Sequence, residues 1–217
     1  MCAILKIIKI PWGSYSFMIN YADFVENGIE SFEYAGYEFT RLCDSNIDDA
    51  VMICDKFLGY GLYKQSELVD ISKNDKHYFY VIYHENQAIG IFYFFADLLQ
   101  TLNDELSELI GEGLQPDSRI GVFRSMALLP EYRNGILTGC LSELVQCILY
   151  ERECVEEIVA LAWIKSEGIP VEQALVLSGY QRLGKVLHPW SKYEGLLCDE
   201  CGSKPCKCDG MLYRFRK

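Results

Sequence analysis

The pattern between residues 120 and 164 leaves few folds open to this chain. An apolar run over 120–129 is typical of a buried strand, and the proline- and glycine-containing loop 130–135 separates it from a long helical pattern. The run 157–164 has the composition of a second buried strand. Two strands joined by a helix pair in parallel, and such crossovers are right-handed. The apolar positions of the helix follow helical spacing: Leu137, Cys140, Leu141, Leu144, Val145 and Ile148.

Further strand and helix patterns surround this unit. We expect an α/β fold with a mixed central sheet and helices on both of its faces, because strands and helices alternate along the chain. The predicted elements are a strand over 37–42, a helix over 47–58, a hairpin of 77–83 and 88–96, a short helix over 170–178 and a closing strand over 211–215.

The domain organisation follows from where these patterns are clear. Residues 1–36 are aromatic-rich and weakly patterned, and we interpret them as an N-terminal extension packed on the core. Residues 37–217 form one domain, a size that can bury a substantial core. Within it, 97–118 is an acidic insertion whose leucines predict an amphipathic helix on the sheet, and 198–208 is a cysteine-rich loop.

Charge and hydropathy exclude several classes of protein. The 217 residues contain 31 acidic and 20 basic side chains, a net charge of −11, which argues against binding to nucleic acid through phosphates. No apolar run approaches the roughly 20 residues that span a bilayer. The lysine-interrupted run 3–10 is followed by no small-residue cleavage site, so we interpret it as a strand and expect a cytoplasmic protein without membrane association.

Four of the ten cysteines lie close together near the C-terminus. Cys198, Cys201, Cys206 and Cys208 have the order Cys-x2-Cys-x4-Cys-x-Cys, and turns that donate two sulfurs from Cys-x2-Cys are typical of zinc sites. Two local disulfides or four free thiols are the alternatives, and the expected reducing compartment disfavours disulfides. We predict a structural zinc site, because four protein ligands leave no position for water or substrate.

The loop before the 136–148 helix is a candidate anion site. Backbone N–H groups converge at a helix N-terminus, where the helix dipole favours negative charge, so a phosphate can bind there. Arg133 can add one charge-assisted contact. The alternative is that Gly135 and Gly139 only satisfy turn geometry and close packing.

Three segments resemble the GNAT superfamily of acyl-CoA-dependent N-acyltransferases. The first is Ala-Leu-Leu-Pro-Glu-Tyr-Arg-Asn-Gly-Ile over 127–136, which is similar to the family's loop that grips the coenzyme A pyrophosphate. The second is the strand 158–164. The third is Ala-Leu-Val-Leu-Ser-Gly-Tyr over 174–180 with the strand-like 181–186 after it. The similarity spans about residues 37–217.

The resemblance implies acetyl-CoA as co-substrate and a set of residues that bind it. Backbone groups of Met126 and Leu128 would hold the pantetheine arm and polarise the thioester. The pyrophosphate would lie against the loop and the first helical turn, which comprise Arg133, Asn134, Gly135, Ile136, Leu137 and Thr138.

The catalytic groups common in this family are not found at the matching positions. The strand that often carries a glutamate reads Val-Phe-Arg-Ser-Met-Ala over 122–127, and Leu175 occupies the usual position of a tyrosine. We take Arg124 and Ser125 as candidates for orienting the substrate and Tyr193 as a candidate acid. The alternatives are a solvated Arg124 and a Tyr193 that only packs on the cysteine loop.

These observations favour an N-acyltransferase that moves an acetyl or other small acyl group to a primary amine by direct attack. The acceptor would be a small molecule or a lysine side chain, and the net charge favours a cationic one. Two alternatives stay open: a catalytically inactive binding or regulatory protein of the same fold, and an acyl-CoA-dependent modifier of nucleic-acid bases. The only support for the latter is the basic C-terminus.

Overall fold

The computed structural model describes residues 30–34, 36–102, 110, 113–133 and 136–217, and its centre is one sheet. Eight strands lie in the order β1-β2-β3-β4-β5-β6-β8-β7. Their bounds are Ser31–Tyr34, Tyr37–Arg41, His77–His84, Gln87–Leu98, Arg119–Leu128, Glu157–Trp163, Gln181–Val186 and Gly210–Phe215 for β1 to β8. Most of the predicted N-terminal extension lies outside the described residues, and its last part is β1, which adds an edge strand beside β2.

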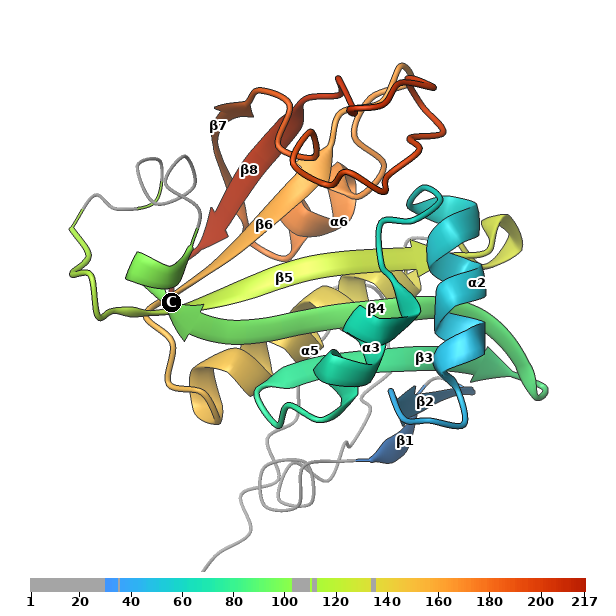
Figure 1. The fold of residues 1–217 in the computed structure, drawn as a ribbon. Helices are drawn as coiled ribbons and strands as arrows, with labels where there is room; N and C mark the ends of the chain where they lie inside the picture. The colour runs from blue at the N-terminus through green and yellow to red at the C-terminus, as the bar shows by residue number, and fades with distance from the viewer. Residues whose placement is uncertain (1–29, 35, 103–109, 111–112, 134–135) are drawn as a thin grey trace, which may run out of the picture.

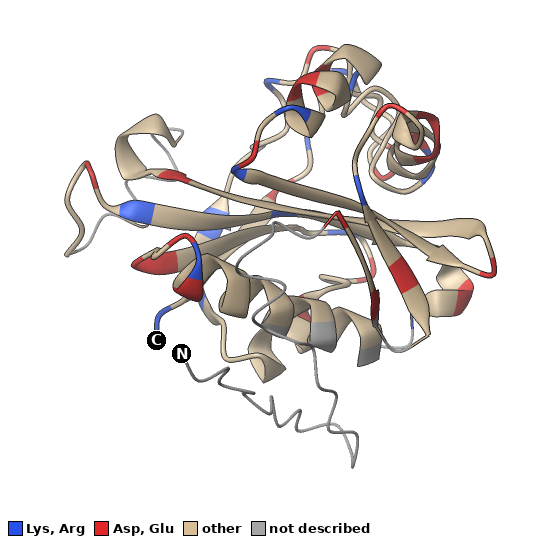
Figure 2. Ribbon diagram, turned by 90° about the horizontal axis from the view of Figure 1, so that it is seen from below, with Lys and Arg blue, Asp and Glu red and all other residues tan. Residues whose placement is uncertain are grey.

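Helices cover both faces of the sheet, which confirms the predicted fold class. The helices are α2 Ile47–Phe57, α3 Gln65–Ser72, α5 Ile136–Glu151 and α6 Glu172–Leu177. Helices α2 and α3 lie on one face and α5 on the other (Figure 1). Figure 2 shows the sheet between these two layers and few charged residues on α5, as expected for a helix of the core. None of the described helices is long and apolar enough to cross a membrane.

The only parallel pair among the described strands is β5 and β6, which α5 connects. All other neighbouring strands are antiparallel. The predicted parallel crossover between residues 120 and 164 is therefore confirmed. The predicted hairpin is also confirmed, although its turn is tighter than expected: only Glu85 and Asn86 connect β3 to β4, both at positive φ.

Two predictions about single elements were wrong or incomplete. The acidic insertion does not begin as a helix, because Asp97 and Leu98 end β4 and a 3-10 turn, Leu99–Thr101, follows. Residues 103–109, which carry Leu106 and Leu109, lie outside the described part of the chain. Helix α3 was not predicted, because its sequence is short and mostly polar and buries only Leu68. Tertiary contacts, not periodicity, hold this helix.

The core contains many aromatic rings on β3 and β4. Residues 78–82 of β3 are all at most 2% exposed, because helices cover both faces of the sheet at this point. The rings of Tyr78 and Phe94 stack across the two strands with centroids 4.9 Å apart. Apolar burial of this kind stabilises each large side chain by about 1.5–3 kcal/mol.

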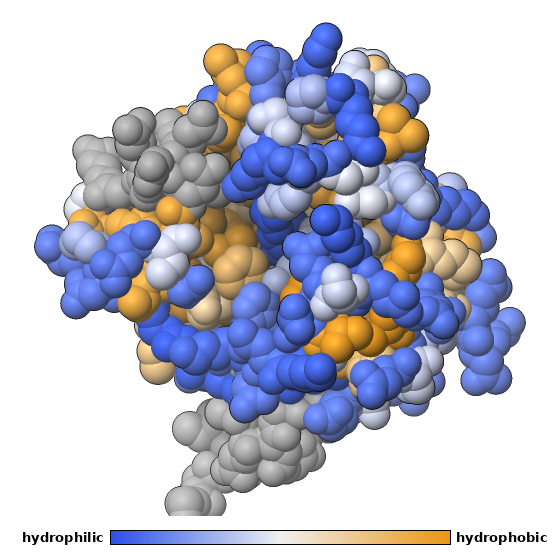
Figure 3. Space-filling model, viewed as in Figure 1, coloured by the Kyte–Doolittle hydropathy of each residue, from blue (hydrophilic) through white to orange (hydrophobic). Residues whose placement is uncertain are grey.

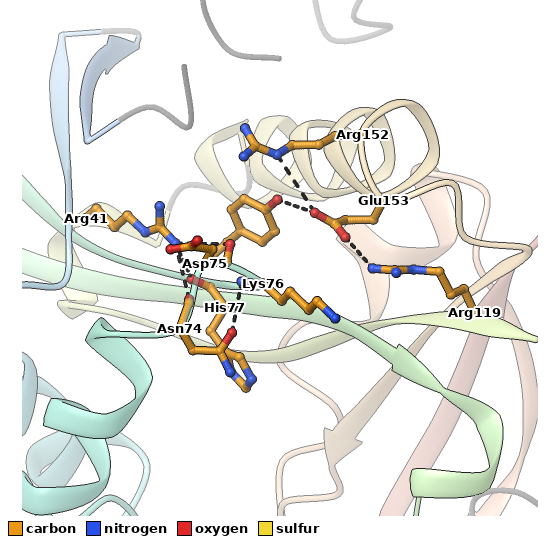
Figure 4. A network of polar contacts seen from close by, with 9 residues as sticks. Arg41, Asn74, Asp75, Lys76, His77, Arg119, Arg152 and Glu153 are labelled. Carbon is orange, nitrogen blue, oxygen red and sulfur yellow. Dashed lines mark hydrogen bonds and ion pairs between the residues drawn. The ribbon is translucent and has the colours of Figure 1, made fainter. Parts of the chain in front are cut away.

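A network of polar contacts closes the sheet where α5 ends, and Figure 4 shows part of it. Glu153 accepts a hydrogen bond from the Tyr78 hydroxyl at 2.5 Å and pairs with Arg119 at 2.5 Å. Arg41 donates to the carbonyls of Asn74, Asp75 and His77 at 3.2–3.3 Å. Beside this network, the buried carboxylate of Glu157 pairs with Arg216 at 2.5 Å. Charged groups at this end of the sheet therefore have partners in the protein.

Candidate active site

The two parallel strands separate along their length. Residues Ile120–Phe123 of β5 pair with Glu157–Ala160 of β6, but beyond these residues the two strands have no ladder between them. Strand β5 continues to Leu128 and β6 to Trp163, so a gap opens at their carboxyl ends. A cavity of about 430 Å³ occupies this region and is lined by α2, α6, the two strands and the first turn of α5.

The ladder between β4 and β5 determines which backbone groups face this gap. The N–H of Leu129 donates to the carbonyl of Ile89, and hydrogen-bonded pairs alternate along an antiparallel ladder. Ser125 and Ala127 therefore bond to β4, while the N–H and C=O groups of Met126 and Leu128 point toward the gap. Arg133 Nε already donates to the carbonyl of Leu128 at 2.8 Å.

A register shift in this ladder lies at Arg124. Tyr93 pairs with Ser125 and Phe94 pairs with Phe123, so Arg124 is an extra residue on β5. Bulges of this kind redirect side chains. Arg124 is half-buried and lines the cavity together with its neighbours Phe123 and Ser125. It is not the solvated strand residue that sequence alone left as an alternative.

The helix mouth is partly described. Arg133 and Thr138 line the cavity, and the Arg133 guanidinium lies 5.1 Å from the centroid of the Phe57 ring. The Leu137 side chain is 2% exposed and belongs to the core, and it is not among the residues that line the cavity. Ile136 is the first residue of α5, and Asn134 and Gly135 lie outside the described residues. The first turn of α5 supplies backbone donors with no partner inside the helix.

Two hydroxyl groups connect the cavity to more distant parts of the chain. Tyr63, which is 6% exposed, hydrogen-bonds through its hydroxyl to Ser125 Oγ at 2.6 Å. Arg124 Nη2 donates to the hydroxyl of Tyr193, and the guanidinium lies 5.5 Å from the centroid of that ring. The three predicted catalytic residues, Arg124, Ser125 and Tyr193, are thus close together, but only Arg124 and Ser125 line the cavity.

Burial determines the protonation of this cluster. It raises the pKa of Tyr63 to about 12, although the nearby Arg124 charge and the Ser125 hydrogen bond oppose the shift. Burial disfavours the charged form of Arg124, but the oxygens of Tyr63 and Tyr193 outweigh it and raise the pKa of Arg124. At neutral pH the cavity therefore contains a guanidinium cation beside a neutral phenol.

Tyr63 was not predicted from the sequence as a site residue. It lies in the loop between α2 and α3, and the sequence pattern around it gives no sign that its hydroxyl reaches the end of β5. No carboxylate is among the described residues that line the cavity, which agrees with the absence of a glutamate on the strand. The three histidines lie elsewhere: His77 contacts Tyr93, His84 contacts Tyr132 and His188 contacts Asp209.

The four C-terminal cysteines converge as predicted. Their sulfur atoms all lie within 4.8 Å of one another, with Cys198 Sγ 3.7 Å from Cys208 Sγ and Cys201 Sγ 3.9 Å from Cys206 Sγ. Four thiolates bound tetrahedrally at about 2.3 Å from one zinc ion lie about 3.8 Å apart. Disulfide sulfurs are bonded at about 2.05 Å. The cluster therefore has the dimensions of a site that could hold a metal ion.

Backbone donors support the most exposed of these sulfurs. Lys207 N–H lies 3.5 Å from Cys201 Sγ. Partial burial opposes ionisation of Cys201, but the hydrogen bonds from Lys207 and Ser203 prevail and lower its pKa to about 6. Thiolates are the form that binds metals, so these donors favour ligation.

The cysteine loop packs against the wall of the cavity. Trp190 lines the cavity and stacks on Trp163 of β6, with ring centroids 4.2 Å apart. On the other side, Leu197 pairs with Tyr60 in the loop that carries Tyr63. Gly61 in that loop has φ +76, and a Cβ there would lie 2.7 Å from the carbonyl oxygen of Gly195. Residues 195–197, directly before the cysteine loop, are therefore in close backbone contact with the α2–α3 loop.

Comparison with known proteins identifies this fold. No protein-family model and no curated protein matches the chain. Arabidopsis thaliana NAA60 in complex with a bisubstrate analogue is similar in structure at 13% identity, with a TM-score of 0.61 over 83% of this chain and 97% of that chain.

Two further solved structures have the same fold. One is the ribosomal-protein-S5-alanine acetyltransferase from Vibrio fischeri, with 14% identity, a TM-score of 0.53 and coverage of 86% of this chain and 96% of that one. The other is an agmatine N-acetyltransferase mutant in its apo form, with 9% identity, a TM-score of 0.54 and coverage of 83% and 100%. The chain therefore has the fold of the GNAT acetyltransferases.

Proposed function

We propose that this protein transfers an acetyl or other small acyl group from acyl-CoA to a primary amine. The observation that carries this proposal is the cavity between the separated ends of β5 and β6, which opens beside the N-terminus of α5. Arabidopsis thaliana NAA60, a protein of this fold, has been solved in complex with acetyl-CoA. The same fold and cavity support acyl-CoA as the ligand here.

The cofactor would bind along this cavity in an extended form. The N–H groups of the first turn of α5, with Arg133 and Thr138, offer hydrogen bonds and positive charge to a pyrophosphate. Asn134 and Gly135 belong to the same proposed site. The N–H and C=O groups of Met126 and the N–H of Leu128 are suited to pair with the amides of a pantetheine arm, much as an additional strand would. The Leu128 carbonyl already accepts a hydrogen bond from Arg133 Nε.

The chemistry is a direct transfer. The amine nitrogen attacks the thioester carbonyl carbon, a C–N bond forms and the C–S bond breaks; the nitrogen gives a proton to water, and the departing thiolate takes one from water. Tyr63 is suited to stabilise the departing thiolate by donating a hydrogen bond to it, because its raised pKa keeps the hydroxyl in the neutral, donor form and Ser125 holds it in place. Arg124 would bind and orient the substrate, and Tyr193 would position Arg124.

We also propose that Cys198, Cys201, Cys206 and Cys208 bind a structural zinc ion. The sulfur–sulfur distances and the four thiol donors support zinc. When bound, the ion supplies a cross-link that stabilises a polar loop too small to fold by itself. The loop in turn holds Trp190 and Tyr193 beside the substrate end of the cavity.

Two measurements test the function. Titration calorimetry with acetyl-CoA should detect binding, and a thiol-detection assay should show coenzyme A release that depends on an amine. Acetyl-CoA that does not bind at millimolar concentration would contradict the proposal. Binding without thiol release over a broad amine panel would favour a catalytically inactive binding protein. The lack of a carboxylate among the described cavity residues supports this alternative.

A further inference from the structure

The charge of the cavity is opposite in sign to that of the whole chain. The sequence has a net charge of −11, yet the charged residues that line the cavity are Arg124, Arg133 and Lys165. No aspartate or glutamate lines it within the described part of the protein. Charges close to a ligand act more strongly than distant, solvent-screened ones. The cavity therefore favours an anionic substrate, in contrast to the cationic acceptor that the net charge suggests.

Arg124 is one of the three cations that line this site. It lies at the register shift of β5, between the cavity residues Phe123 and Ser125. A guanidinium has five N–H donors. Among the described residues, one hydrogen bond of Arg124 is found, the one to the neutral hydroxyl of Tyr193. Most of its donors are thus available to a ligand.

Several other arginines pair with carboxylates, whereas Arg41 and Arg133 donate to backbone carbonyls. Arg119 pairs with Glu153, Arg182 with Glu172 and Arg216 with Glu157. No described carboxylate pairs with Arg124, although removal from water makes an unpaired cation costly. A carboxylate that binds in the cavity would offset this cost with two parallel, charge-assisted hydrogen bonds.

We propose that Arg124 binds a carboxylate of the substrate next to the thioester, so that one of the two reactants carries a free carboxylate. This inference rests on the proposed acyl transfer. The carboxylate belongs either to the acceptor, which is then an amino acid, or to the acyl chain, which is then a dicarboxylic monothioester. Tyr193 acts as a positioning residue, because its hydroxyl holds Arg124 Nη2 from outside the cavity.

The first arm of the test uses the acceptor. Coenzyme A release is measured with the twenty amino acids and with their carboxamides, which keep the amine and lose the negative charge. If the acceptor carries the carboxylate, kcat/KM for the best amino acid exceeds that of its amide by about 10- to 100-fold. Arg124→Met removes this preference, and Arg124→Lys restores part of it.

The second arm uses the acyl donor. If the acyl chain carries the carboxylate, succinyl-CoA reacts faster than butyryl-CoA by a similar factor, and Arg124→Met again removes the difference. Lys73→Met is the matched control, because Lys73 is exposed and outside the cavity but its loss changes the net charge equally. Tyr193→Phe should raise KM for the carboxylate substrate a few-fold and leave kcat unchanged.

Binding measurements separate this inference from the proposed function. Calorimetry of acetyl-CoA with wild-type protein and with Arg124→Met reports acyl-CoA binding alone. Ligand-detected NMR with N-acetylamino acids and their amides reports carboxylate binding without catalysis. If acetyl-CoA fails to bind but an N-acetylamino acid binds through Arg124, acyl transfer is contradicted and the carboxylate site is retained. If amides and carboxylates behave alike in every arm, or Arg124→Met changes neither preference, the carboxylate site is wrong.

Discussion

The two ends of the β5–β6 pair differ in whether the strands are hydrogen-bonded to each other and whether the nearby arginine is paired with a carboxylate. At one end the strands are hydrogen-bonded from Ile120 to Phe123, and the nearby Arg119 is paired with Glu153. At the other end the strands separate, and Arg124 has a phenol but no described carboxylate as partner. Adjacent stretches of one strand thus build a closed end, where Arg119 is paired with a carboxylate, and an open end with spare donors.

This difference distinguishes charges that stabilise the fold from charges available to a ligand. Glu153 accepts hydrogen bonds from Tyr78 and Arg119 together, so its carboxylate is committed to the fold (Figure 4). The face of the molecule drawn in Figure 3 gives no comparable signal. Hydrophilic side chains cover most of the face in Figure 3, and apolar side chains form only scattered patches between them. The open end of the pair is where ligand chemistry is expected.

The largest effect should come from removing the support of the open end. Cys206→Ser removes a buried sulfur of the cysteine cluster, and we expect loss of bound metal and at least about 3 kcal/mol of stability. For a domain of this size that corresponds to a Tm lower by roughly 6–12 °C. Native mass spectrometry reports the metal, and calorimetry reports the Tm.

The control for this experiment is Cys154→Ser, because Cys154 is exposed and outside the cluster. It should keep the metal and shift the Tm by less than about 2 °C, since surface substitutions usually change stability by no more than about 0.5 kcal/mol. Equal metal content in wild-type protein and Cys206→Ser would rule out the cysteine cluster as the metal site.

A second large effect should appear in catalysis at the open end. Tyr63→Phe removes the hydroxyl bonded to Ser125, and we expect coenzyme A release to slow about 100-fold, or about 2.7 kcal/mol in the barrier. Acetyl-CoA binding should be unchanged in calorimetry. Tyr60→Phe, three residues away and 64% exposed, should retain the wild-type rate. Equal rates for both variants would remove Tyr63 from the mechanism.

The closed end should show the reverse behaviour. Glu153→Gln removes the charge that pairs with Arg119 and weakens the bond to Tyr78, so we expect a loss of about 2 kcal/mol in the free energy of unfolding. The rate of thiol release per folded molecule should not change. Urea denaturation measures the free energy of unfolding. The control is Glu156→Gln, because Glu156 is exposed and close to Glu153 in sequence. A large loss of activity with intact stability would show that the two ends are coupled.

The smallest effect should be a pH dependence at the closed end. Burial raises the pKa of Glu157 above its ordinary value, although Arg216 opposes the shift. Folding therefore favours the protonated form of Glu157. The stability that this protonation contributes is fully present at pH values below the pKa of Glu157 in the unfolded chain, and it is lost as the pH rises through the pKa of Glu157 in the folded protein.

Urea denaturation at several pH values between 4.5 and 8 tests this sign. The free energy of unfolding of wild-type protein relative to Glu157→Gln should decrease as pH rises, because glutamine does not titrate. The comparison cancels the titration of all other carboxylates. A difference that stays constant or increases with pH would show that the Arg216 pair, and not burial, determines this pKa.

Much of the fold could be predicted because its signals are local. The helical stripe of α5, the apolar runs of β5 and β6 and the turn between β3 and β4 each follow from the spacing of nearby residues. The spacing of the four cysteines likewise predicted that they meet, since they belong to one short loop. Helix α3 escaped prediction because a short polar segment depends on what it packs against.

The site itself was only half determined by sequence. Resemblance indicated Met126, Leu128 and the helix mouth, because these lie in one continuous strand–loop–helix unit. The link between Arg124 and Tyr193 joins residues 69 positions apart, and that between Tyr63 and Ser125 joins residues 62 apart. An extra residue in β5 and the packing of residues 195–197 on the α2–α3 loop bring these groups together. Such contacts depend on chain topology and packing, which no local pattern encodes.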